Sequence, residues 1–185
     1  GPAALPDLPK AGEISAALAE ARPQLLDAAI GGLSADSTHT VVAGEPVMTW
    51  ALYSFDEHDG DAFDQMTPTG EVLVPLLVDG EVVGTMEMTL DGSSWRYAGT
   101  GGDLAVRAND AERLLLEDLG AGAETRVVVG GYYYWAMARS GLREAAVFFS
   151  SRLPEFVPES LEGKDAPDPS RVYEGDELLE YLRAL

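Results

Sequence analysis

The clearest structural pattern in this sequence is VLVPLLVDGEVVGTMEMTLDGSSWRYAGTG, residues 72–101. Asp79-Gly80 and Asp91-Gly92 separate three runs rich in β-branched, apolar and aromatic residues. The runs are 71–78, 81–90 and 94–98. Asp-Gly is typical of the two-residue turns that join antiparallel strands. The stretch therefore predicts a three-stranded antiparallel meander.

The middle run of this meander alternates between two kinds of side chain. Thr85, Glu87 and Thr89 fall on one side of a strand, and Met86 and Met88 fall on the other. Such alternation is typical of a sheet with one buried face. We expect the second face to be wet or only partly covered.

Three helices are predicted outside the meander. Apolar residues recur at helical spacing over 14–28, where Pro23 either kinks the helix or starts a second one. Asn109 begins a capping box before a leucine-rich helix, with an earlier start at Asp103 as the alternative. An amphipathic helix is expected over 176–185.

Further strands are expected on both sides of the middle helix. They are 38–42, 46–53, 125–138 and 143–149, and the last two form a strand pair. Short turns between neighbouring strands favour antiparallel pairing over a doubly wound sheet. The predicted fold class is α+β: an antiparallel β-sheet, a meander plus a second strand pair, packed against N-terminal, middle and C-terminal helices.

The predicted organisation is one domain with one arm. Residues 1–12 are expected to form a flexible arm, in which Gly1-Pro2 matches the remnant that a protease leaves after removing an expression tag. Residues 13–185 are expected to form a single α+β domain, since no stretch resembles an interdomain linker. Within it, 153–175 carries four prolines, Pro154, Pro158, Pro167 and Pro169, and is expected to be irregular.

The chain is strongly acidic, with 32 acidic against 12 basic residues and a formal charge of −20. A nucleic-acid backbone or an anionic membrane surface repels such a charge, so no nucleic-acid partner is expected. No apolar run is long enough for direct insertion into a membrane. There are no cysteines, which excludes disulfides and thiolate chemistry. The electrostatic partners left are cations, basic peptides and basic proteins.

One stretch of the chain gathers acidic residues around Gly60. The candidate metal ligands are Asp56, Asp59, Asp61 and Asp64. Oxygen-rich loops bind Ca²⁺, so Ca²⁺ is the candidate cofactor. The spacing of these acids lacks the EF-hand pattern. The alternative is a solvated loop without a cofactor. His58 in this loop and His39 are the two histidines of the chain, and neither lies in a known catalytic or metal motif.

The aromatic run 132–135 supplies the candidate binding residues Tyr132, Tyr134 and Trp135. In a continuous strand, Tyr132 and Tyr134 would share one face and Tyr133 and Trp135 the other. Exposed tyrosine and tryptophan are typical of binding surfaces. The alternative is a strand covered on both faces.

Motifs of common enzyme classes are missing from the sequence: there is no G-x-S-x-G, no P-loop and no kinase signature. We therefore expect a non-enzymatic domain that binds a protein or a small ligand. Two alternatives stay open. One is a small, cone-shaped, pocket-bearing α+β enzyme, and the other is an acidic inhibitor or immunity-type protein that binds a basic partner.

The quoted meander, with the helix and strands that follow it, resembles a group of uncharacterised secreted or lipid-anchored α+β domains of high-GC Gram-positive bacteria. The resemblance covers residues 70–150 and rests on a hydrophobic strand, a DG turn, a Gly-Thr strand, a Trp strand and a leucine-rich helix. It implies an extracellular or cell-surface-anchored location, with a cytoplasmic location as the alternative. It implies no activity and no functional residue.

Overall fold

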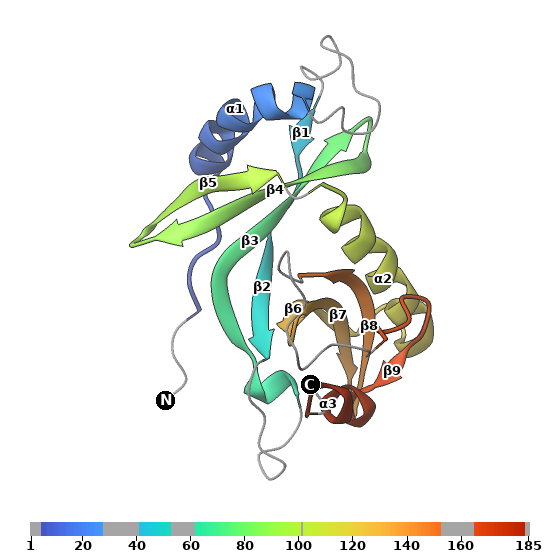
Figure 1. The fold of residues 1–185 in the computed structure, drawn as a ribbon. Coiled ribbons are helices and arrows are strands. Elements are labelled where there is room, and N and C mark those ends of the chain that lie inside the picture. Colours follow the sequence, from blue (N-terminus) through green and yellow to red (C-terminus); the bar gives the residue numbers. More distant parts are fainter. Residues whose placement is uncertain (1–4, 28–40, 53–61, 101, 153–164, 184–185) are drawn as a thin grey trace. The chain divides into compact units, whose positions relative to one another are not determined.

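The computed structural model describes residues 5–27, 41–52, 62–100, 102–152 and 165–183. Over these residues it is an α+β fold with three α-helices and a nine-stranded, mostly antiparallel sheet (Figure 1), which confirms the predicted fold class. The strand order is β5-β4-β3-β2-β6-β7-β8-β9, and β1 pairs with β3 beside this path. Two compact units share the fold. Unit 1 comprises Gly1–Thr49 and Pro68–Val106, and unit 2 comprises Trp50–Thr67 and Arg107–Leu185.

The elements follow one another along the chain as helix, strands, helix, strands and helix. They are α1 (Ala11–Asp27), β1 (Val42–Ala43), β2 (Val47–Leu52), the 3₁₀ helix η3 (Phe63–Gln65), β3 (Thr67–Val78), β4 (Glu81–Asp91), β5 (Ser94–Thr100), α2 (Leu104–Leu119), β6 (Glu124–Gly130), β7 (Tyr133–Ser140), β8 (Arg143–Ser151), β9 (Tyr173–Glu174) and α3 (Gly175–Arg183).

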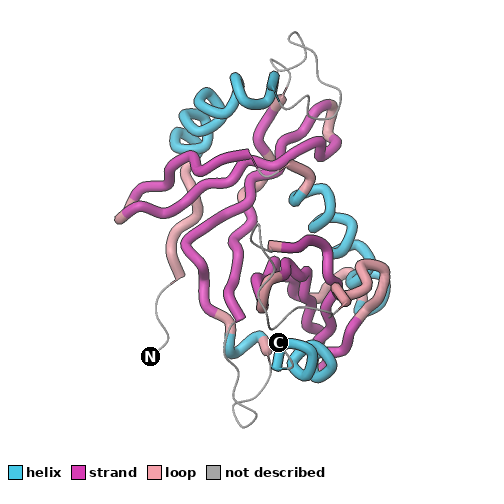
Figure 2. The backbone as a smooth tube through the Cα atoms, in the orientation of Figure 1, coloured by secondary structure: helices cyan, strands magenta, loops and turns pink. Residues whose placement is uncertain are grey.

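The predicted meander is present as β3, β4 and β5, joined by two tight turns (Figure 2). Asp79 and Gly80 have φ values of 51° and 80°, the pattern of a type I′ turn, whose twist matches that of the flanking strands. The second turn lies one residue later than expected, at Gly92-Ser93, because Asp91 pairs with Ser94. The predicted wet face is only partly correct, since Thr85 is fully buried.

Helix α1 is continuous through Pro23, so the alternative of a second helix is wrong. It packs mainly against β5, and its buried side chains join those of the meander in one apolar core. That core contains Ala17, Leu18, Ala21, Leu25, Val41, Val72, Val74, Leu76, Met86, Met88 and Trp95.

Residues just before α1 are attached to β5 through Trp95. The indole Nε1 of Trp95 donates to the carbonyl of Asp7 at 2.8 Å. The Glu13 carboxylate accepts the backbone N–H groups of Trp95 at 2.7 Å and Lys10 at 3.0 Å. These N–H donors, first that of Lys10 and then that of Trp95, hold the pKa of Glu13 below its ordinary value.

Glu13→Gln is expected to destabilise unit 1 at neutral pH and to have no effect in strong acid. A depressed carboxylate pKa stabilises the folded state above the unfolded pKa, and that contribution is lost as the pH falls through the folded pKa. The difference in unfolding free energy between wild type and variant should therefore shrink below about pH 4. Urea unfolding at a series of pH values measures it, with Glu20→Gln on the exposed side of α1 as the control. A difference that does not change with pH would contradict the assignment.

The prediction of one strand over 125–138 is wrong, because this segment forms two strands, β6 and β7. Gly131, with a φ of 62°, and Tyr132 form a turn in which Gly130 pairs with Tyr133. The predicted strand pair is consequently a second meander, β6, β7 and β8. Its second turn is Gly141-Leu142, since Ser140 pairs with Arg143.

Helix α2 begins at Leu104, so the helix start predicted at Asn109 is wrong and the earlier alternative is correct. The first turn of α2 is capped from another element. The hydroxyl oxygen of Thr85 in β4 accepts the Ala105 N–H at 2.7 Å. This bond satisfies an N–H that has no partner within its own helix, and it explains a buried threonine in the meander.

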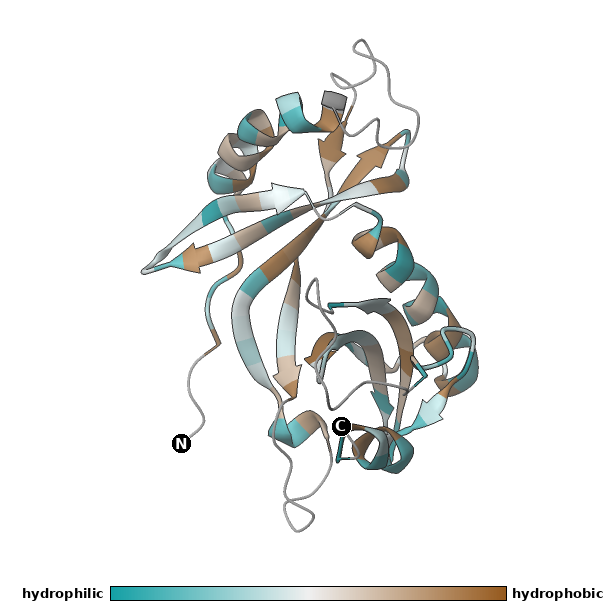
Figure 3. Ribbon diagram, viewed as in Figure 1, coloured by the Kyte–Doolittle hydropathy of each residue, from teal (hydrophilic) through white to brown (hydrophobic). Residues whose placement is uncertain are grey.

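The C-terminal part of unit 2 completes its core. Tyr173 and Glu174, inside the segment expected to be irregular, form β9, which pairs with β8. Helix α3 follows at once and carries both hydrophobic and hydrophilic positions (Figure 3). The core contains Leu52, Ala62, Phe63, Met66, Val128, Tyr133, Trp135, Met137, Ala146, Phe148, Tyr173, Leu178 and Leu182.

Candidate functional site

An open pocket of about 540 Å³ lies in unit 2 where β8 and α3 begin and β9 ends. It is lined by Ala62, Leu142, Arg143, Glu144, Glu174, Gly175, Asp176 and Leu179. Hairpin β7–β8 supplies the residues from Leu142 to Glu144, while β9 and α3 supply those from Glu174 onward. Charged and apolar groups therefore line one pocket, which we call the Glu144 pocket.

Glu144 is a buried acid, with 7% of the residue exposed. Its Oε2 accepts the Ala62 N–H at 3.0 Å, and its Oε1 accepts the Phe63 N–H at 3.3 Å. The carboxylate thus caps η3, whose first N–H groups have no acceptor of their own. A charged acceptor makes stronger hydrogen bonds than a neutral one, which offsets part of the cost of burial.

The rim of the pocket is acidic but carries one cation. Arg143 donates to both carboxylate oxygens of Glu174, at 2.6 and 3.2 Å, and to Asp118 at 2.7 Å. These hydrogen bonds, first that with Glu174, raise the pKa of Arg143 above its already high value. Asp176 is exposed in the first turn of α3, where the helix dipole favours an anion. The pocket lining thus has three carboxylates and one guanidinium.

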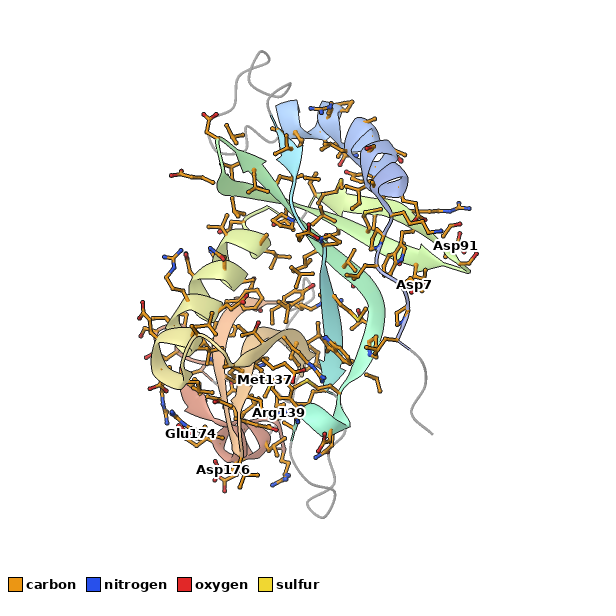
Figure 4. The ribbon with its side chains drawn as sticks, turned by 180° about the vertical axis from the view of Figure 1, so that it is seen from behind. Asp7, Asp91, Met137, Arg139, Glu174 and Asp176 are labelled. Carbon is orange, nitrogen blue, oxygen red and sulfur yellow. The ribbon has the colours of Figure 1, made fainter. Side chains whose placement is uncertain are left out.

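The start of α3 lies very close to β8. A Cβ atom added to Gly175 would be 3.1 Å from the Cβ of Glu144 and 3.4 Å from its carbonyl oxygen. This close approach brings Glu174 and Asp176 to the same end of unit 2 (Figure 4). A side chain at 175 would require Glu144 or the start of α3 to shift by a few tenths of an ångström.

Leu142 forms the apolar rim of the Glu144 pocket. It is the second residue of the Gly141-Leu142 turn, and its relative exposure is 102%. Leu179 on α3, which is half-buried, adds a second apolar side chain to the lining. The pocket can therefore receive a group that has both a positive charge and an apolar part.

The predicted binding residues do not form the exposed surface that the sequence suggested. Tyr134 is 6% exposed and Trp135 is 0% exposed, so the alternative of a strand covered on both faces is correct for these two residues. Trp135 packs edge-on against Tyr133, Phe148, Tyr173 and Tyr181. On the other face of β7, Tyr134 stacks on Phe149 with the ring centroids 5.8 Å apart. Tyr132 lies in the β6–β7 turn and is half-buried.

Three of the four candidate metal ligands, Asp56, Asp59 and Asp61, lie outside the described residues, as do His39 and His58. Among the residues that the structure does describe, no group of three or more acidic or histidine side chains could hold a metal ion. The Ca²⁺ site stays a prediction.

Asp64, the fourth candidate ligand, lies in η3 beside a stack of cations and aromatic rings. Its Oδ1 is 3.6 Å from a guanidinium nitrogen of Arg139. The guanidinium carbon of Arg139 lies 4.8 Å from the ring centroid of Phe63. That of Arg126 lies 4.7 Å from Phe63 and 3.9 Å from Trp50. This stacking holds η3 in place, and Trp50 within it is half-buried.

Sequence reasoning missed Glu144 and Leu142. Glu144 is one of 32 acids, and the signal that could have singled it out is its place in the strand sequence REAAVFF, 143–149. An acid in an otherwise apolar strand needs a partner when it is buried. Leu142 in a two-residue turn had no core position to fill, which is a signal of exposure.

None of the helices in the described part of the chain combines the length and apolar character of a membrane span. Comparisons with protein families, curated proteins and solved structures found no match to this chain.

Proposed function

We propose that this protein is a non-enzymatic, extracytoplasmic binding domain that docks a basic segment of a partner protein at the Glu144 pocket. The observation that carries the proposal is the lining of this pocket, with three carboxylates against one guanidinium beside a fully exposed leucine. Its charge has the same sign as the net charge of −20. A basic partner is therefore attracted at long range and has a place to bind at short range.

The location part of the proposal rests on the sequence. The resemblance of residues 70–150 to secreted or lipid-anchored bacterial domains supports an extracytoplasmic site of action. Fractionation of the source cells, with an antibody against this chain, tests it: the protein should occur outside the cytoplasm. Recovery in the cytoplasmic fraction would favour the immunity-type alternative.

A second candidate function, a pocket-bearing α+β enzyme, is favoured by one observation, the buried carboxylate of Glu144 at the pocket. Both oxygens of this carboxylate accept main-chain N–H groups of η3. That arrangement supports a structural role more than proton transfer. The binding proposal uses Leu142, Glu174 and Asp176 of the lining, whereas the enzyme proposal uses Glu144 alone.

The binding proposal is tested with a lysine-rich peptide titrated into the full chain at about 20 mM and about 300 mM salt. Binding should weaken steeply with salt. Glu174→Gln/Asp176→Asn should lower the affinity about tenfold, since each lost charge contact is worth up to about 1 kcal/mol. Glu20→Gln/Glu81→Gln in unit 1 removes the same charge from exposed positions and should change the affinity less. Equal effects of the two double variants would show that binding is not located at the pocket.

A further inference from the structure

Leu142 is the feature of the Glu144 pocket that charge alone does not explain. A leucine with a relative exposure of 102% contributes no buried apolar area to the fold. It lies at the tip of hairpin β7–β8, directly before Arg143 and Glu144. The residue is thus available to a partner at no cost in folding free energy.

Apolar and acidic groups are arranged side by side around this pocket. Ala62, Leu142 and Leu179 are its apolar side chains, and Glu174 and Asp176 are the carboxylates on its rim. A partner with lysine or arginine alone would meet the carboxylates and leave Leu142 in water. A partner with charge and apolar side chains on one surface would use both.

We infer that the occupant of the Glu144 pocket is an amphipathic basic segment of a partner protein, which buries an apolar side chain against Leu142 while a lysine or arginine side chain faces Glu174 and Asp176. The inference rests on the proposed function. It adds that the basic segment of the partner also carries an apolar side chain that binds at the pocket. Charge complementarity selects a basic segment, and the exposed leucine selects an amphipathic one.

Two synthetic peptides of equal length and equal positive charge test the inference. In one, lysine alternates with serine, and in the other, leucine replaces part of the serine. Each peptide is titrated into the full chain at near-physiological salt, and calorimetry measures its affinity. The leucine peptide should bind about tenfold more tightly, as expected when one leucine side chain is largely buried.

Matched variants locate the apolar contact. Leu142→Ser should remove most of the tenfold advantage of the leucine peptide and leave the thermal unfolding temperature unchanged. Val42→Ser is the control, because Val42 is an exposed apolar residue of unit 1, with 57% exposure. It should keep the advantage.

The outcomes separate the two proposals. Equal affinity for both peptides, with strong salt dependence, would overturn the inference and leave the proposed function standing. Loss of the advantage in Val42→Ser rather than in Leu142→Ser would also overturn it. If neither peptide binds even at low salt, the proposed function itself fails.

Discussion

Glu144→Ala is expected to lower the free energy of unfolding by about 3 kcal/mol, because it leaves two buried N–H groups without an acceptor. These are the N–H groups of Ala62 and Phe63 at the start of η3. Each unsatisfied buried donor costs about 1–3 kcal/mol. The loss is larger than that for a typical surface acid, because Glu144 is a buried acceptor for a segment 82 residues away in the sequence.

Urea unfolding at neutral pH measures this loss, and two variants serve as controls. Glu144→Gln keeps one oxygen acceptor and should cost about 1–2 kcal/mol. Glu174→Gln lies on the rim of the same pocket, has a side chain that is 42% exposed, and should cost less than about 1 kcal/mol. Similar losses for Glu144→Ala and Glu174→Gln would contradict the capping role of Glu144.

Contacts other than the Glu144 cap also hold η3, and they limit the effect of Glu144→Ala on the pocket. The guanidinium groups of Arg126 and Arg139 both lie over the Phe63 ring, and the Phe63 carbonyl accepts a hydrogen bond from Arg126 at 3.1 Å. Loss of the Glu144 cap removes only the bonds at the first N–H groups. Glu144→Ala should thus disturb the Ala62 side of the pocket while leaving Leu142 exposed.

The first meander could be predicted from the sequence because its signals are local. Asp79-Gly80 specifies a two-residue turn, and the strand alternation beside it specifies which side chains lie inward. The second meander was harder to predict. Gly130-Gly131 lies inside a run of apolar and aromatic residues that also fits one long strand, and Tyr132, a good strand residue, occupies the turn.

Long-range contacts account for the remaining errors. The start of α2 depends on the Thr85 hydroxyl of strand β4, which accepts the Ala105 N–H. The local capping pattern at Asn109 was therefore misleading. The Glu144 pocket depends on β8, β9 and α3 meeting in space. In a chain with 32 acids, no local pattern tells which acid is buried.

Trp135→Ala is expected to destabilise the protein at least as much as Glu144→Ala does. The expected loss is about 3–5 kcal/mol of unfolding free energy, or failure to fold. Trp135 is 0% exposed and contacts four aromatic rings of unit 2. Its indole N–H also donates to the Gly130 carbonyl at 3.3 Å. Truncation therefore creates a large cavity and also leaves a buried carbonyl with one partner fewer.

Trp135→Phe keeps the protein measurable and separates a core role from a binding role. It should cost about 1–3 kcal/mol, since the smaller ring leaves part of the cavity and makes no hydrogen bond. Tyr132→Ala, at the half-buried turn position of the same aromatic run, should cost about 1 kcal/mol or less. If Trp135 is a core residue, Trp135→Phe should lower the free energy of unfolding more than Tyr132→Ala does. A binding residue predicts unchanged stability in Trp135→Phe with weaker binding of the basic peptides, and that result would restore the surface role that the sequence suggested.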